Sequence, residues 1–197
     1  MESLRPAIRL VLALAALSLV AAFFLPVWQI QLWAPQYPEG LNMKIWLTRI
    51  TGDVDIINGL NHYIGMKSIK AEMFPEFKFM HLINGALIVV GLLPAFTGRR
   101  RWLHVFALIL CLCGVLAMAD FYVWGYNYGH NLNPKAAISV PGLSYEPPLF
   151  GYKNLLNFVA YSGPDSGGWV VIGVGVIAVG LALWEQWFAA LFLRAKK

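Results

Sequence analysis

The chain has 197 residues, of which 59% are hydrophobic and only 13% charged, and its formal net charge is +5. Its excess of Lys and Arg falls beside long apolar stretches, where basic side chains favour anionic lipid headgroups over nucleic acid. We therefore exclude a nucleic-acid-binding role and expect membrane lipid to be the partner of these charges.

Four apolar stretches are long enough to cross a bilayer. They cover residues 10–28, 79–96, 104–124 and 169–193, and each approaches the roughly 20 residues that a helix needs to cross the hydrocarbon core. The first resembles a signal peptide but is longer than a usual apolar region of that kind, so we expect it to remain as a span that Pro26 kinks or ends. The sequence predicts an all-α integral membrane protein with four transmembrane helices.

The basic residues fall on one side of these spans. Short loops rich in Lys and Arg stay in the cytoplasm, which predicts a bacterial inner-membrane protein with both termini cytoplasmic. The residues that set this orientation are Arg5, Arg9, Arg99, Arg100, Arg101, Arg194, Lys196 and Lys197. The connecting segments 34–78 and 125–168 balance their charges and are predicted to lie outside.

These two outer segments are too long for simple connectors and predict an ordered extracytoplasmic cap. In the first, residues 34–40 are expected to form a turn and extended chain. Thr51-Gly52-Asp53 then predicts the start of a helix over Val54 to Tyr63, with Gly65 as its stop. The second is rich in Pro, Gly, Asn and Tyr and predicts irregular structure, with a short helix over 155–161.

The fourth span carries small residues that favour close helix packing in lipid. This face predicts an interface within the bundle or with a partner. Glu185, near the cytoplasmic end of the span, is expected to be hydrated or paired with Arg194 or a neighbouring Arg. The small residues are Gly173, Gly175, Ala178, Gly180 and Ala182.

Soft donor side chains gather on the predicted outer side. His62 and Met66 are four residues apart, which would place an imidazole and a thioether on one helical face. A soft sulfur donor favours copper over hard cations, so this pair indicates a copper site. The predicted topology adds His81 and His130 as ligands, with Asp120, Met80 and Met118 behind them. Packing and hydrogen bonding remain alternatives for each, including a pair of His81 with Asp120.

Other chemistries have less support. His81 and His104 begin their spans in opposite leaflets, about 30 Å apart by helical rise, so they cannot hold one haem; His81 with His130 stays open as a surface haem site. The sequence has no phosphate-binding loop, dinucleotide-binding glycine pattern, HExxH or nucleophile elbow. We therefore predict that the protein is not an enzyme.

Several outer motifs carry a resemblance to a known family. They are residues 34–41 (APQYPEGL), 57–66 (INGLNHYIGM), 128–134 (YGHNLNP), 147–149 (PPL) and 155–158 (LLNF). They resemble a family of small membrane proteins encoded beside nitrous oxide reductase and its copper-supply factors. The resemblance implies an accessory role in copper handling or maturation of a periplasmic copper enzyme. His62, Met66 and His130 lie within its motifs.

Two hypotheses follow. In the first, His62, Met66 and His130 bind or relay copper, with His81 as a fourth ligand and Asp120 orienting an imidazole. In the second, the protein is a structural subunit without metal, which docks on a larger membrane complex through the fourth span and an aromatic cap.

Overall fold

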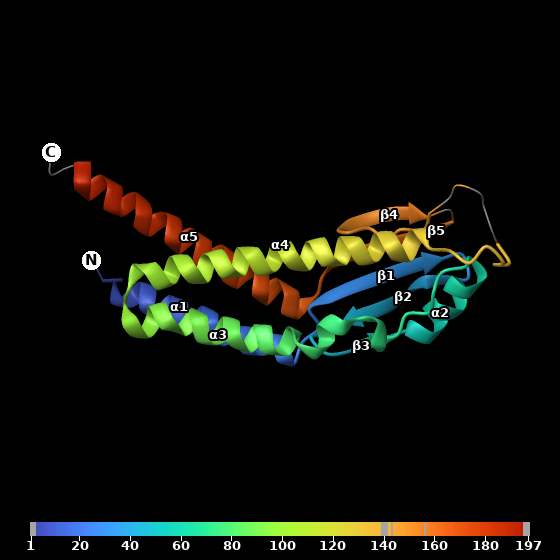
Figure 1. Ribbon diagram of the computed structural model, residues 1–197, viewed down its shortest axis with the longest axis horizontal. Coiled ribbons are helices and arrows are strands. Elements are labelled where there is room, and N and C mark those ends of the chain that lie inside the picture. Colours follow the sequence, from blue (N-terminus) through green and yellow to red (C-terminus); the bar gives the residue numbers. More distant parts are fainter. Residues whose placement is uncertain (1–2, 139–141, 143, 156, 195–197) are drawn as a thin grey trace.

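The structure is a computed structural model that describes every residue except 1–2, 139–141, 143, 156 and 195–197, with side chains described up to residue 187. Lys196 and Lys197 of the predicted basic tail lie outside the described residues. The molecule is elongated, with a helical bundle at one end and a cap at the other (Figure 1). We use the word cap for residues 28–79 and 131–164.

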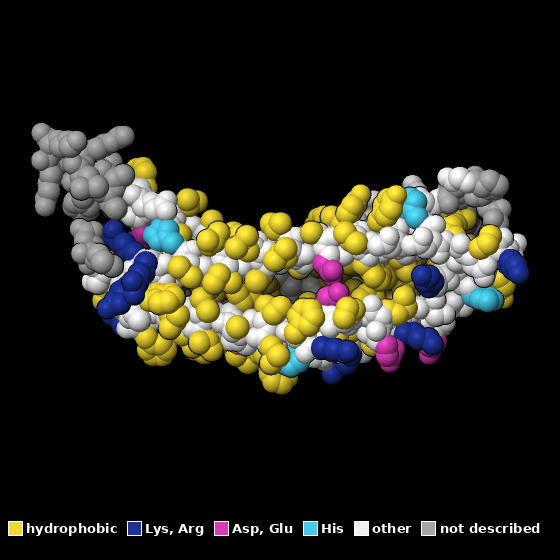
Figure 2. Space-filling view, viewed as in Figure 1, with side chains coloured by type: hydrophobic (Ala, Val, Ile, Leu, Met, Phe, Trp, Pro, Cys, Tyr) yellow, Lys and Arg dark blue, Asp and Glu magenta, His cyan; other side chains and the backbone are white. Residues whose placement is uncertain are grey.

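Four helical segments form the bundle, and all are long and apolar enough to cross a membrane. Helix α1 (Pro6–Ser18) continues as the 3-10 segment η1 (Leu19–Phe23). The other three bundle helices are α3 (Met80–Thr97), α4 (Arg100–His130) and α5 (Ser166–Arg194). Hydrophobic side chains cover the middle of the bundle, while Lys and Arg gather at the end far from the cap and are spread over the cap (Figure 2).

The prediction of an all-α protein is wrong, because the cap contains a five-stranded antiparallel sheet. Its strands are β1 (Trp28–Ala34), β2 (Tyr37–Ile45), β3 (Ile50–Gly52), β4 (Gly151–Leu155) and β5 (Phe158–Pro164), in the spatial order β3-β2-β1-β5-β4. The chain leaves helical conformation at Phe24, and Trp28 begins a strand instead of ending the first span. The short helix predicted over 155–161 is a β-hairpin, since β4 and β5 pair with each other there.

Pairing between β1 and β5 joins the two outer segments into one sheet. The antiparallel register sets Trp28 opposite Pro164 and Trp33 opposite Val159. Both segments therefore lie at the same end of the bundle, while the start of α1 and the end of α5 lie at the other (Figure 1).

The predicted helix in the first outer segment is confirmed as α2 (Val54–Tyr63). Asp53 precedes it, but its carboxylate accepts a hydrogen bond from the backbone of Asn42 (2.8 Å) and so ties the helix to β2. The stop at Gly65 is also confirmed, because this residue has φ +81, a conformation that favours glycine. Two short 3-10 turns, η2 (Ala71–Met73) and η3 (Pro75–Lys78), then lead to α3.

The bundle is held by close packing around Leu12, Leu103 and Phe106, which are fully buried. A Cβ atom at Gly91 would lie 2.7 Å from the Phe106 ring and 2.8 Å from Ala16, so α3 approaches α1 and α4 more closely than any larger residue allows. Such contacts stabilise helix association in lipid, where hydrophobic burial supplies little drive.

Helix α5 divides its small residues between two environments. Ala178 and Ala182 are buried in the bundle core. Gly173, Gly175 and Gly180 instead face open space where a Cβ would project. Only part of the predicted small-residue interface is therefore used within the bundle.

A buried ion pair joins α4 and α5 at the end far from the cap. Arg100 Nε lies 2.6 Å from Glu185 Oε2, and the Glu185 side chain is 1% exposed. The prediction that Glu185 pairs with a neighbouring Arg is confirmed. At the same end, Arg9 donates to the last carbonyls of α3, Ala95 O (2.7 Å) and Phe96 O (3.0 Å).

We expect Arg100→Ala to lower the free energy of unfolding by about 3 kcal/mol, because the buried Glu185 carboxylate would lose its partner. Arg101→Ala is the matched control, since Arg101 is exposed and should contribute less than about 0.5 kcal/mol. Unfolding in detergent micelles, followed by circular dichroism, measures both. Equal effects of the two substitutions would contradict this assignment.

Candidate functional site

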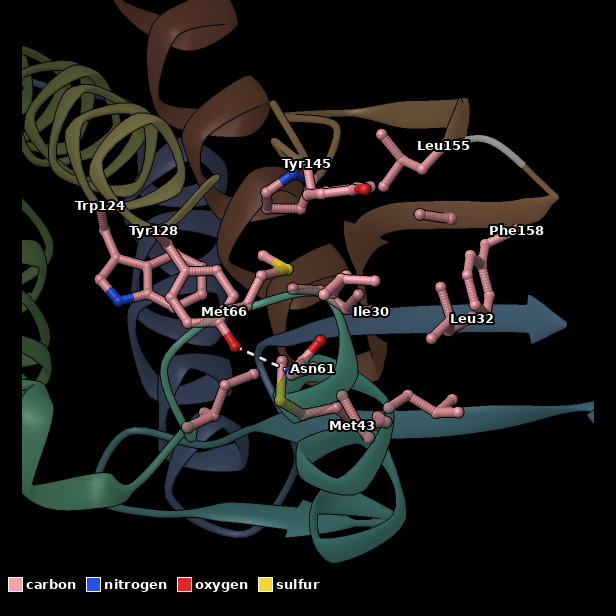
Figure 3. Close-up of a pocket in the computed structure, with 16 residues that line it drawn as sticks. Ile30, Leu32, Met43, Asn61, Met66, Trp124, Tyr128, Tyr145, Leu155 and Phe158 are labelled. Carbon is pink, nitrogen blue, oxygen red and sulfur yellow. Dashed lines mark hydrogen bonds between the residues drawn. The ribbon is translucent and has the colours of Figure 1, made fainter. Parts of the chain in front are cut away.

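An apolar cavity of about 80 Å³ lies between the sheet, α2 and the outer end of α4 (Figure 3). Its lining comes from many separate parts of the chain. The lining residues are Ile30, Leu32, Met43, Ile57, Leu60, Asn61, Ile64, Met66, Ile69, Trp124, Tyr128, Tyr145, Pro147, Leu155, Phe158 and Ala160.

Strand and helix periodicity explain why these side chains converge. Ile30 and Leu32 are two residues apart on β1, so both point to the same face of the sheet. On α2, Ile57, Leu60 and Asn61 have the spacing that places side chains on one helical face. The cavity is thus the place where the inner sheet face and the buried face of α2 meet the end of α4.

A short chain of hydrogen bonds crosses the cavity wall. Asn61 Nδ2 donates to the Tyr128 hydroxyl (2.8 Å), which donates to Lys67 O (2.7 Å). Asn61 and Tyr128 are only 7% and 6% exposed, respectively. This chain fixes α2 against the end of α4, and Figure 3 shows its first bond.

Tyr145 provides a different kind of polar group. Its side chain is 2% exposed and lines the cavity, yet its hydroxyl has no hydrogen-bond partner among the described atoms. The cavity also receives the thioethers of Met43 and Met66. Apart from its two tyrosines, the lining that the structure describes contains no titratable side chain. The site therefore suits binding of a small apolar group or a soft cation better than acid–base catalysis.

The residues that the sequence predicted as copper ligands have different surroundings in the structure. Met66 lines the cavity, whereas His62 is exposed on α2 and lies beside Tyr63, with ring centroids 6.3 Å apart. His130 ends α4, and its Nδ1 lies 2.9 Å from Tyr126 O and 3.5 Å from Glu146 Oε1. His130 is thus held by α4 and by Glu146.

The remaining predicted residues lie near the outer end of the bundle. His81 is half-buried near the start of α3, and its Nδ1 has no hydrogen-bond partner among the described atoms. Asp120 is exposed on α4, and Met80 and Met118 are half-buried. Within the described residues, no group of three or more His, Cys, Asp and Glu side chains is placed to hold a metal ion.

Sequence reasoning missed most of the cavity. Asn61 had a detectable signal, because a polar residue at the helical spacing of Ile57 and Leu60 indicates a buried hydrogen bond. Tyr145 had none, since it lies in the segment before β4 and is held against the end of α4 by its backbone bond to Gly129 O (3.0 Å).

In comparisons with known proteins, no family model, no curated protein and no solved structure matches the chain. The resemblance to proteins encoded beside nitrous oxide reductase therefore stays a prediction.

We expect Tyr128→Phe to lower the free energy of unfolding by about 1–3 kcal/mol, because the buried Asn61 amide and the Lys67 carbonyl would lose their partner. Tyr145→Phe is the matched control. It removes a buried hydroxyl that has no partner, so it should leave stability unchanged or raise it. Thermal unfolding of both variants in detergent measures the difference, and a larger loss for Tyr145→Phe would refute this reading of the cavity.

Proposed function

We propose that this chain is a non-enzymatic accessory protein of the bacterial inner membrane, which docks on a partner protein through the outer face of its sheet. The four apolar helices support the membrane placement. The orientation follows from Arg5, Arg9 and the 99–101 turn, which lie at the end of the bundle far from the cap; short basic loops remain cytoplasmic. The cap then faces the periplasm.

The observation that carries the docking proposal is the chemistry of the outer sheet face. Successive side chains of a strand point to opposite faces of the sheet, so the residues between those that line the cavity point to the outer face. We call it the open face and define it by Gln29, Gln31, Trp33, Tyr152, Asn154 and Tyr161. Tyr152 is 72% exposed there.

Aromatic rings on the open face are ordered by their neighbours. The rings of Trp33 and Tyr152 are stacked with centroids 6.2 Å apart, and those of Tyr152 and Tyr161 are 4.8 Å apart. A Cβ at Gly40 would lie 2.7 Å from Trp33 Nε1, so glycine at this position lets the indole lie against β2. Side chains that are ordered before binding lose less entropy when a partner arrives.

This composition favours a protein partner. Exposed aromatic side chains are enriched at protein interfaces, where they supply large apolar contact areas and polar tips. The amides of Gln29, Gln31 and Asn154 add donors and acceptors without charge. Lys44, opposite Gln29 on β2, brings one charge to this face, and Asp165 pairs with it (3.3 Å).

We expect Trp33→Ala combined with Tyr152→Ala to weaken the complex at least about tenfold, as loss of aromatic anchors does at other interfaces. Migration of the complex from native membranes, solubilised in mild detergent, measures this effect on a native gel. Tyr63→Ala is the control, because Tyr63 is 58% exposed but lies on α2. A wild-type protein that migrates as a monomer, or a double variant that migrates like the wild type, would refute docking through this face.

Copper handling is the second candidate, and one observation favours it. Met43 and Met66 both line the cavity, and thioethers are preferred ligands of copper(I). In this second proposal Met66 stays a copper ligand, as the sequence predicted, and Met43 takes the place of His62 and His130.

We expect the double substitution Met43→Leu and Met66→Leu to abolish stoichiometric copper(I) binding, since leucine fills a similar volume without sulfur. Met73→Leu is the control, because Met73 is 37% exposed and outside the cavity. Competition with a copper(I) chelator measures affinity for purified protein. Binding that survives the double substitution but is lost in His62→Ala and His130→Ala would favour the original ligand set instead.

A further inference from the structure

A second hollow lies outside the apolar cavity, where α4 leaves the bundle. It is a groove of about 230 Å³. Tyr122 and Tyr126 of α4 form one wall, and the proline pair 147–148 lies across from them. Glu146 and Lys153 bring one negative and one positive charge to the same groove.

These two charges contact each other only loosely. Lys153 Nζ lies 3.5 Å from Glu146 Oε2, and the side chains are 41% and 25% exposed. His130 Nδ1 lies 3.5 Å from the other carboxylate oxygen of Glu146. A long, half-exposed pair of this kind contributes little by itself, so a ligand with two opposite charges can engage both groups.

The position of the groove along α4 gives its depth in the proposed membrane. Tyr122 is 22 residues after Arg100 on a continuous helix, which corresponds to about 33 Å at 1.5 Å per residue. The hydrocarbon core is about 30 Å thick, and the headgroup layers extend it to about 40–45 Å. With Arg100 at the cytoplasmic interface, the groove lies among the headgroups of the opposite leaflet.

A lipid-facing stripe leads from the groove into the membrane. Residues on it follow the helical spacing of four and three and are all exposed. They are Leu108, Leu112, Val115, Ala119, Tyr122 and Tyr126. An acyl chain that lies along this stripe would place its headgroup between the two tyrosines and the proline pair.

We infer that this groove binds the headgroup of a zwitterionic phospholipid that carries an ammonium group, such as phosphatidylethanolamine. Lys153 binds the phosphate, and Glu146 accepts hydrogen bonds from the ammonium. The exposed ring of Tyr122 adds cation–π attraction, while the Tyr126 ring stacks on His130 (centroids 4.0 Å apart). The inference goes beyond docking and depends only on the membrane placement proposed above.

Charge and position separate this ligand from others. An anionic headgroup without an ammonium would leave Glu146 unmatched beside a phosphate, which is unfavourable. A protein segment would have to enter the headgroup layer to reach the groove. A phospholipid is already present in that layer. Its phosphate matches Lys153, and its ammonium matches Glu146.

Native mass spectrometry of the full-length protein tests this inference. The protein is purified in detergent, delipidated and titrated with phosphatidylethanolamine or phosphatidylglycerol of identical acyl chains. We expect one phosphatidylethanolamine to bind about tenfold more tightly than phosphatidylglycerol, a difference of about 1.4 kcal/mol. Equal binding of the two lipids would overturn the inference.

Two conservative variants assign the charges. Glu146→Gln should abolish the preference for phosphatidylethanolamine without weakening phosphatidylglycerol, and Lys153→Met should weaken both lipids. Lys44→Met is the matched control, since Lys44 forms a similar pair with Asp165 (3.3 Å) away from the groove. A preference that persists in Glu146→Gln would also overturn the inference.

The result is independent of the docking proposal, because no partner protein takes part in this measurement. Carbonate washing of membranes, which leaves integral proteins in the pellet, tests the membrane placement separately. Loss of docking with retained lipid preference, or the reverse, therefore shows which proposal fails.

Discussion

The antiparallel ladder between β1 and β5 is the interaction on which the rest of the structure depends. It pairs strands that are far apart in the sequence, and each strand connects to a bundle helix: β1 follows η1, and β5 precedes α5. Backbone bonds extend this junction, because Gly167 N donates to Pro26 O (2.9 Å). The ladder thereby fixes α1 and α5 at their outer ends, while the Arg100–Glu185 pair fixes α4 and α5 at the other end.

The ladder also gives the cap its two distinct faces. Because side chains alternate along a strand, β1 sends Ile30 and Leu32 into the cavity and Gln29, Gln31 and Trp33 to the open face. The inner face is closed by α2 and the end of α4, which the Asn61–Tyr128 bond holds together. The apolar cavity and the polar aromatic surface are thus two consequences of one strand pairing.

The spans and α2 could be predicted from the sequence because their signals are local. Uninterrupted apolar stretches indicate the bundle, and Asp53 with the spacing of Ile57 and Leu60 indicates α2. The sheet could not be found in this way. Gln29–Trp33 alternates over only five residues directly after a span, and the end of β5 contains Ser162, Gly163 and Pro164, which favour turns; its partner is fixed by a distant register. Met66 could be predicted near the site because it follows α2 directly in the sequence. The contact of His130 with Glu146 could not be predicted, because it joins α4 to the segment before β4.

One continuous helix, α4, connects the buried ion pair, the bundle core, the groove and the cavity. It has 31 residues, or a length of about 46 Å, and no proline occurs within it. Arg100 holds its first turn, Phe106 packs in the bundle core, Tyr122 and Tyr126 line the groove in its last third, and Tyr128 lines the cavity. A rod of this stiffness cannot tilt at one end alone, so a displacement of the arginine turn would reposition both the groove and the cavity wall at the other end of the bundle.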